Sequence, residues 1–317
     1  MPSTRKTLTR GIPLLAITVT AALAFSACSS DSSAVPTSNP TSSASNALSS
    51  VYSNAAVASA ADLIPDSTMA KIKARGKLIV AEALDAPLLS QQDPSNPDNV
   101  EGFDADLAKL LAIYILGTPS VEIIPPASET REALLQNGTV DVVFNTYTIT
   151  TERDAQVDFA GPYLQSGLAV AVKSDNTSIQ SVSDLGGKTV IVGANTPAVT
   201  AVPEQQPTAK VVSFATDPEA VLALTQGRGD AYVQDFTLLA SDAASNKAIK
   251  VVGQPFTTES YGIGLKNNDT QFKSFINAWL TKIEASGDWA KVWNATLGSA
   301  VTSSTPTPPA IGSVPGS

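Results

Sequence analysis

The 317-residue chain contains no histidine and a single cysteine. Without histidine it cannot build Ser-His-Asp or Cys-His nucleophile systems, His-rich zinc sites or an imidazole acid–base catalyst. An enzyme would have to rely on carboxylate, lysine or tyrosine chemistry. With only Cys28 available, no internal disulfide can form. We expect no metal ion and no cofactor.

Basic residues are also scarce. The chain has 20 Lys and Arg against 29 Asp and Glu, and none of the basic residues lies between Arg10 and Lys71. Loss of residues 1–27 would remove three basic and no acidic residues, which leaves 17 against 29. Such a surface repels phosphate backbones and anionic lipid head groups. We expect no nucleic-acid partner.

The two ends of the chain differ in composition from its middle. Residues 1–27 combine early basic residues, an apolar run and small residues before Cys28, as an export signal does. The apolar run is shorter than the ~20 residues of a spanning helix, although a retained membrane anchor is the alternative. Residues 28–61 and 301–317 are rich in Ser, Thr, Ala and Pro, so we predict a flexible tether and a disordered tail.

Short β-branched runs alternate with helical stretches between residues 62 and 300. This alternation predicts an α/β fold with largely parallel sheets. A body of this length accommodates two hydrophobic cores, although a single doubly wound domain is the alternative. We predict strands at residues 77–83, 121–125, 140–144, 168–173, 189–193, 210–214, 231–235, 250–253 and 261–266.

An arginine follows the predicted strand at residues 140–144. Thr150 or Thr151 can cap a short helix there, and Arg153 would lie at its start, where free backbone N–H groups favour an anion. A guanidinium binds a carboxylate through two parallel hydrogen bonds, and the hydroxyl of Thr148 can donate a third. The alternative is a surface ion pair of Arg153 with a neighbouring aspartate, Asp154 or Asp158.

The pattern of the whole segment 148–163 favours a carboxylate-binding role for Arg153 over a surface ion pair. Its pattern, Thr-x-x-x-Glu-Arg followed by Val-Asp-Phe-Ala-x-Pro-Tyr, resembles the extracellular solute-binding proteins, family 3, which serve polar amino acid ABC transporters. The Gly-Phe-Asp-x-Asp-Leu segment at 102–107 also resembles this family. The resemblance implies a periplasmic-binding-protein-like type II fold, in which two α/β lobes are joined by two hinge strands. The lobes would be 62–167 plus 260–300 and 168–259.

The resemblance also assigns ligand contacts. Arg153 and Thr148 would hold the α-carboxylate of an amino acid, and the loop at Asn195 and Thr196 would add donors from the second lobe. Asp235, at the end of a predicted strand, would accept the α-ammonium group, or else cap the next helix. Asp85 would contact the amine or the side chain of the ligand, or else stabilise a turn.

A second arginine could contact the side chain of the ligand. Arg131 follows the strand at 121–125, and it is the best candidate to neutralise a side-chain carboxylate. The alternative is a solvated ion pair with Glu129 or Glu132. Residues 121–163 are most similar to actinobacterial glutamate-binding lipoproteins, which implies glutamate as the first ligand and glutamine or aspartate next.

The resemblance further implies a lipoprotein. Cys28 would carry a lipid that anchors the protein to the outer face of the cell membrane, although Phe25 stands where this signal prefers leucine. The partners would be a free amino acid, membrane lipid and ABC permease subunits, and the protein would be a monomer. Two alternatives stay open. One is a ligand sensor for a membrane signalling partner, and the other is a dehydratase of cyclic amino or keto acids with Asp85 or Glu259 as its acid.

Overall fold

The computed structural model describes residues 48–301 and 304–317. The predictions for the export signal at 1–27, for Cys28 and for most of the tether lie outside these ranges. Within them, no helix is both long enough and apolar enough to cross a membrane.

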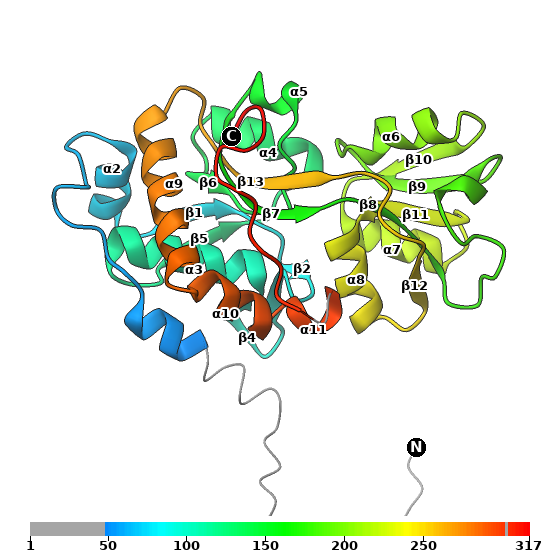
Figure 1. The fold of residues 1–317 in the computed structure, drawn as a ribbon, viewed down its shortest axis with the longest axis horizontal. Coiled ribbons are helices and arrows are strands. Elements are labelled where there is room, and N and C mark those ends of the chain that lie inside the picture. The colour runs from blue at the N-terminus through cyan, green and yellow to red at the C-terminus, as the bar shows by residue number, and fades with distance from the viewer. Residues whose placement is uncertain (1–47, 302–303) are drawn as a thin grey trace, which may run out of the picture. The chain divides into compact units, whose positions relative to one another are not determined.

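The first of two lobes is built on a five-stranded sheet with the strand order β5-β1-β6-β13-β7. Three strands are parallel, whereas β13 runs antiparallel to both of its neighbours. Figure 1 shows helices α2, α3, α9 and α10 grouped around this sheet. The strands are Leu78–Ala81 (β1), Val121–Ile124 (β5), Val142–Val143 (β6), Asp158–Ser166 (β7) and Glu259–Leu265 (β13), and the helices are Thr68–Arg75 (α2), Phe103–Leu116 (α3), Arg131–Gln136 (α4), Thr151–Asp154 (α5), Thr270–Ala285 (α9) and Asp288–Ala295 (α10).

The second lobe repeats this plan with the strand order β10-β9-β11-β8-β12. Again three strands are parallel, and β8 is antiparallel to its neighbours on both sides. The strands are Leu168–Lys173 (β8), Thr189–Gly193 (β9), Lys210–Phe214 (β10), Ala231–Asp235 (β11) and Ile249–Val252 (β12), and the helices are Ala198–Gln205 (α6), Asp217–Thr225 (α7) and Phe236–Ser245 (α8). The predicted fold of two α/β lobes is confirmed, and each of the nine predicted strands overlaps a strand of one of these two sheets.

The chain passes between the sheets twice, at the two hinge segments. Strand β7 ends at Ser166 in the first sheet and β8 begins at Leu168 in the second, so only Gly167 separates them. The return runs from β12 through residues 253–258 into β13. A Cβ atom on Gly167 would overlap the carbonyl oxygen of Thr257 in the return segment. The two crossings therefore lie against each other, and only glycine fits at the first.

Aromatic packing holds the first lobe together. Phe103 contacts Trp289 and Trp293 edge-on, with ring centroids 5.5 and 5.6 Å apart, and the two indoles stack on each other. The indole N–H of Trp289 donates to the carbonyl of Tyr163 at 2.9 Å. Helix α3 is buried on almost every side, from Phe103 to Ile115. This core fixes the carboxyl ends of the sheet from which the site residues project.

The sequence interpretation differs from the structure at both ends of the described body. Residues 48–54 of the expected tether are helical, and Val51 is buried in the first-lobe core. Residues 304–317 of the expected disordered tail run along the same lobe, where Ile311 packs against the core and the N–H of Gly312 donates to the carbonyl of Gly161 at 2.8 Å. The average hydrophobicity of both segments is low, so the sequence did not indicate that Val51 and Ile311 would pack against the core.

Four strands and one helix cap also differ, and one of these strands is β7 of the first sheet, which the predicted strands did not include. Asp85–Ala86 (β2), Ser90–Asp93 (β3) and Asn96–Glu101 (β4) form a small antiparallel sheet that the polar sequence did not predict. Helix α7 is capped by Thr216 in a capping box with Glu219, so Asp217, at the first helical position, is not its cap. The side chain of Asp217 is thereby free to point elsewhere.

Gly102 supports a test of this packing. Its φ is +135°, and a Cβ atom there would overlap the backbone of Leu89, whereas Gly76 has a φ of +78° with open space around it. We expect Gly102→Ala to destabilise the protein by about 2 kcal/mol or more, and the control Gly76→Ala to cost about 1 kcal/mol. Thermal unfolding of both variants measures the difference. Equal losses of stability in the two variants would show that overlap with the backbone of Leu89 does not destabilise Gly102→Ala.

Candidate functional site

A cavity of about 210 Å³ lies between the two lobes. Its volume is below the usual range for drug-sized ligands, which suits a molecule the size of an amino acid. The first lobe contributes carboxyl ends of strands and the loops after them, and the second lobe contributes the ends of β9, β10 and β11. The charged and polar side chains that line it are Asp85, Ser90, Asp104, Ser128, Arg131, Asn145, Thr146, Thr148, Arg153, Thr196, Thr216, Asp217, Gln234 and Asp235.

Arg153 is buried at the start of α5. Thr150 caps this helix, and its hydroxyl oxygen accepts from the backbone N–H of Arg153 at 3.3 Å. The side chain of Arg153 is only 5 % exposed, and its Nη1 donates to the carbonyl of Thr148 at 2.7 Å. Its Nε lies 3.4 Å from Oε1 of Glu132. The alternative of a surface pair with Asp154 or Asp158 is therefore wrong, because the guanidinium points inward.

Arg131 lies beside it and is equally buried. Its Nε donates to the carbonyl of Ser128 at 2.9 Å, and its Nη1 donates to the carbonyl of Asn145 at 3.2 Å. Both guanidinium groups lie near the ring of Tyr147, at 4.6 Å for Arg131 and 4.7 Å for Arg153. Burial and the neighbouring charge of Arg153 lower the pKa of Arg131 to about 10, so it stays charged at neutral pH. The solvated ion pair offered as an alternative for Arg131 is not what the structure shows.

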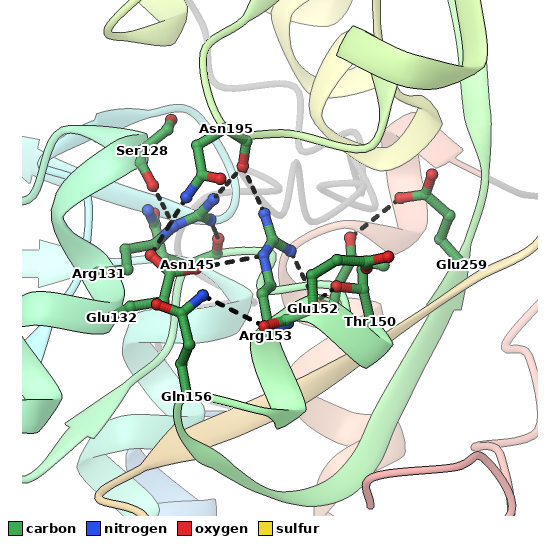
Figure 2. A network of polar contacts seen from close by, with 11 residues as sticks. Ser128, Arg131, Glu132, Asn145, Thr150, Glu152, Arg153, Gln156, Asn195 and Glu259 are labelled. Atoms are coloured by element: carbon green, nitrogen blue, oxygen red, sulfur yellow. Dashed lines mark hydrogen bonds and ion pairs between the residues drawn. The ribbon is translucent and has the colours of Figure 1, made fainter. Parts of the chain in front are cut away.

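The backbone of Asn195, in the second lobe, reaches both arginines. Its carbonyl accepts from Nη2 of Arg153 at 2.6 Å and from Nη2 of Arg131 at 3.5 Å, as Figure 2 shows. The residue has a φ of +53°, and its side-chain amide donates to Glu132 at 3.2 Å. The N–H of Ser128 also donates across the cleft, to the carbonyl of Ala215 at 3.2 Å. The lobes are thus closed on each other, and a carbonyl from one lobe occupies the guanidinium groups of the other.

Two threonines predicted to contact the ligand line the cavity, but their hydroxyl groups are engaged within the protein. The hydroxyl of Thr148 donates to Oε2 of Glu259 at 3.0 Å. The hydroxyl of Thr196 donates to the carbonyl of Gly193 at 2.8 Å. Either group would have to rotate, or accept a hydrogen bond itself, before it could contact a ligand.

Asp235 ends β11 and is 3 % exposed. It occupies the N-cap position of α8 but makes no side-chain capping bond, and its Oδ1 is buried without a hydrogen-bond partner among the described residues. Burial and the adjacent carboxyl of Glu259 raise its pKa well above the ordinary value for aspartate. The capping role offered as an alternative is therefore absent. A buried acceptor oxygen on the cavity wall favours a ligand that carries a hydrogen-bond donor.

Three further aspartates surround the cavity. Asp85 lies at its mouth on β2, and partial burial raises its pKa. Asp217 accepts from the hydroxyl of Tyr232 at 2.7 Å, and its pKa is raised to about 6 by burial. Asp104 also has a pKa raised to about 6 by burial, and it accepts from the N–H of Thr146 at 2.9 Å.

Sequence reasoning did not identify two of these aspartates as site residues. Asp104 belongs to the segment at 102–107 whose pattern resembles the family, and Asp217 is the first residue of helix α7. For Asp104 the available signal was its place at the first turn of a helix that follows the Gly-Phe motif, close to the carboxyl ends of the strands. Asp217 offered no such signal, because only tertiary packing brings it to the cavity.

The arrangement of charge defines what the cavity can hold. Arg153 and Arg131 gather on one wall, whereas Asp235, Asp85 and Asp217 project from others. Among the described residues, no group of His, Cys, Asp or Glu side chains has the arrangement of a metal site. The lining therefore complements a small molecule that carries both an anionic and a cationic group.

Known proteins resemble this chain over most of its length. The model for bacterial extracellular solute-binding proteins, family 3, matches residues 78–298. An ABC transporter glutamine-binding protein of Bacillus subtilis is 36 % identical over 228 residues, which is 71 % of this chain and 83 % of that protein. A glutamate-binding protein of Corynebacterium efficiens is 33 % identical over 246 residues, which is 74 % of this chain and 82 % of that protein.

Solved structures give the same result. An ancestral amino acid-binding protein, described as a precursor of cyclohexadienyl dehydratase, superimposes with a TM-score of 0.66 at 34 % identity. The match covers 73 % of this chain and 99 % of the ancestral protein. Two α/β lobes, a lined cavity between them and a family match over more than two thirds of the chain agree. The chain belongs to the bacterial extracellular solute-binding proteins, family 3.

Proposed function

We propose that this protein is the substrate-binding component of an ABC importer and binds one polar amino acid as a zwitterion between its lobes. One observation carries the proposal. Arg153 and Asp235 are both buried on the wall of one small cavity, and an oxygen of Asp235 has no hydrogen-bond partner among the described residues. A bound zwitterion would supply the missing partner, with its carboxylate towards Arg153 and its ammonium group towards Asp235.

The α-carboxylate would replace the carbonyl of Asn195 at Arg153. That carbonyl now accepts from both guanidinium groups. A carboxylate is a stronger acceptor than a neutral carbonyl, because a charge-assisted bond is about twice as strong as a neutral one. Asn195 and Thr196 would then face the carboxylate from the second lobe, with their backbone N–H groups as donors, since the hydroxyl of Thr196 is engaged with Gly193.

The side chain of the ligand would meet opposite charges. Arg131 lies on one wall, with its Nε and Nη1 engaged by carbonyl oxygens, whereas Asp85 and Asp217 face the same cavity from others. A carboxamide satisfies both, because its oxygen accepts from the arginine and its NH₂ donates to a carboxylate. A second carboxylate would meet the aspartates unfavourably. We therefore place glutamine first, ahead of glutamate and aspartate, although the sequence interpretation had put glutamate first.

Related proteins suggest the membrane partner and the location of this protein. The Bacillus subtilis relative is named as a glutamine-binding protein of an ABC transporter, so we propose permease subunits in the membrane as the partner. A lipid on Cys28 would anchor a monomer at the outer face of the cell membrane. Closure of two lobes around a ligand gives the permease a conformation to recognise. A sensor would use the same closure, and the sensing alternative differs only in the membrane partner.

We propose binding rather than catalysis. The dehydratase alternative named Asp85 or Glu259 as its acid, and a general acid needs an enclosed position at the ligand that keeps it protonated. Glu259 does not line the cavity, and Asp85 lies exposed at its mouth. Incubation with arogenate or prephenate should therefore give no product above the uncatalysed rate. Turnover that disappears in Asp85→Asn or Glu259→Gln would reverse this conclusion.

The first binding prediction concerns Arg153. Arg153→Ala leaves the ligand's carboxylate without its guanidinium, which costs about 2–5 kcal/mol when a buried charge loses its partner. We expect the Kd for glutamine, measured by titration calorimetry, to rise about 30-fold to several thousand-fold. Arg228→Ala removes an exposed arginine that lies over Phe214, and it serves as the matched control with an unchanged Kd. Equal Kd values for Arg153→Ala and the parent would contradict the assignment.

The second prediction concerns side-chain preference. Asp85→Asn removes a negative charge at the cavity mouth without changing the size of the side chain. We expect the ratio of glutamate to glutamine affinity to rise about fivefold to tenfold, since Asp85 is exposed and two unit charges about 4 Å apart in water interact by on the order of 1 kcal/mol. Competition titrations of the two amino acids measure this ratio. Asp175→Asn, which changes an exposed aspartate outside the cavity, is the control and should leave the ratio unchanged.

A further inference from the structure

The carboxyl groups of Asp235 and Glu259 meet at the hinge, one from each lobe. In β11, Asp235 pairs with Leu168, and in β13, Glu259 pairs with Ser166. Leu168 and Ser166 are the two residues that flank Gly167, where the chain crosses between the sheets. Asp235 and Glu259 are therefore held side by side at the crossing, and they are only 3 % and 6 % exposed.

Two carboxyl groups in this position must hold a proton. Their side chains lie close enough to act on each other directly, and two carboxyl oxygens can form a hydrogen bond only when one of them carries a hydrogen. Glu259 is the better acceptor of the two, because the hydroxyl of Thr148 donates to its Oε2 at 3.0 Å and that of Thr257 to its Oε1 at 3.4 Å. Asp235 therefore carries the shared proton.

Among the described residues, no cation other than Arg153 acts on the pair. Arg153 is the cation that acts on both carboxyl groups, but its guanidinium is engaged by Thr148, Asn195 and Glu132. The remaining groups that face the pair are neutral hydroxyls, those of Thr148 and Thr257 at Glu259 and that of Tyr261 at Asp235. Burial raises the pKa of each acid, and the neighbouring Glu259 raises the pKa of Asp235 further, whereas Asp235 acts to lower that of Glu259.

We propose that the Asp235–Glu259 pair is a proton-exchange site, which gives up its shared proton to solvent when the ammonium group of the ligand reaches Asp235. This inference rests on the proposed function, because it takes an amino acid as the ligand. The exchange balances: a carboxylic acid, a carboxylate and an ammonium ion become two carboxylates, the same ammonium ion and one released proton. Glu259 does not line the cavity, so it is a positioning residue that acts through Asp235.

The sign of the pH dependence follows. The ligand-free pair binds one more proton than the ligand-bound pair, so binding is opposed by protons and strengthens as pH rises. The affinity increases by up to about tenfold per pH unit while the ligand-free pair holds its proton, and it levels off above the raised pKa of the pair. Asp104 and Asp217, whose pKa values are about 6, also line the cavity, so only a comparison with a variant isolates the pair.

The experiment is titration of the parent protein with L-glutamine in phosphate and in Tris buffer at the same pH. These buffers differ in ionisation enthalpy, so the difference in binding heat counts the protons released. We expect roughly one proton per ligand for the parent. Glu259→Gln keeps the shape and can donate to an ionised Asp235, so it should release close to none and lose most of the pH dependence of Kd between about pH 5.5 and about pH 7.5. A merely structural role of Glu259 would change Kd without changing the number of protons.

Glu284→Gln is the matched control. Glu284 is a half-buried glutamate on α9 with a raised pKa, and it lies outside the cavity, so the variant should release as many protons as the parent. Equal proton release by Glu259→Gln and the parent overturns the inference, as does binding by the parent with no release. If Glu259→Gln fails to fold, Glu259→Asp, which moves the second carboxyl away from Asp235, takes its place, and proton release equal to that of the parent overturns the inference. A parent that binds no amino acid on a full panel overturns the proposed function itself, and this result is distinct from binding without proton release.

Discussion

The structure depends on two buried guanidinium groups that lie side by side. Arg131 and Arg153 both lie near Tyr147, and burial removes the water that would otherwise screen their repulsion. They need acceptors, and the protein supplies carbonyl oxygens from Ser128, Asn145, Thr148 and, across the cleft, Asn195. Closure of the lobes and the chemistry of the cavity are consequences of this one requirement, because the acceptor that joins the lobes occupies the position that an anionic ligand would take.

A second constraint on the structure comes from two buried carboxyl groups, one of which lies on the cavity wall. Asp235 and Glu259 are buried carboxyl groups on which Arg153 acts, and they lie at the Gly167 crossing. Because one acid comes from each lobe, the proposed loss of their shared proton would change the charge at the crossing between the lobes. Asp235 therefore belongs both to the cavity wall and to the crossing between the two sheets.

Much of the fold could be read from the sequence because the signals were local. Each β-branched run formed a strand, and Thr150 capped the helix that carries Arg153. The sequence also named Arg153, Thr148, Asp235, Asp85, Arg131 and Thr196, which the structure brings to one cavity. Asn195 does not line the cavity, and its backbone carbonyl accepts from Arg153 instead. Local signals were misleading where a single apolar residue outweighed its polar neighbours, as Val51 and Ile311 did at the two ends of the body.

The sequence by itself determined the alternation of strands and helices, the cap that presents Arg153 and the excess of acid over base, because each depends on residues close together in the chain. Only the tertiary structure decided that Asp217 faces the cavity, that Thr148 donates to Glu259 and that Asp235 meets Glu259 at the crossing. These contacts join residues far apart in the chain, and they follow from where two sheets place their strand ends. No local pattern contains that information.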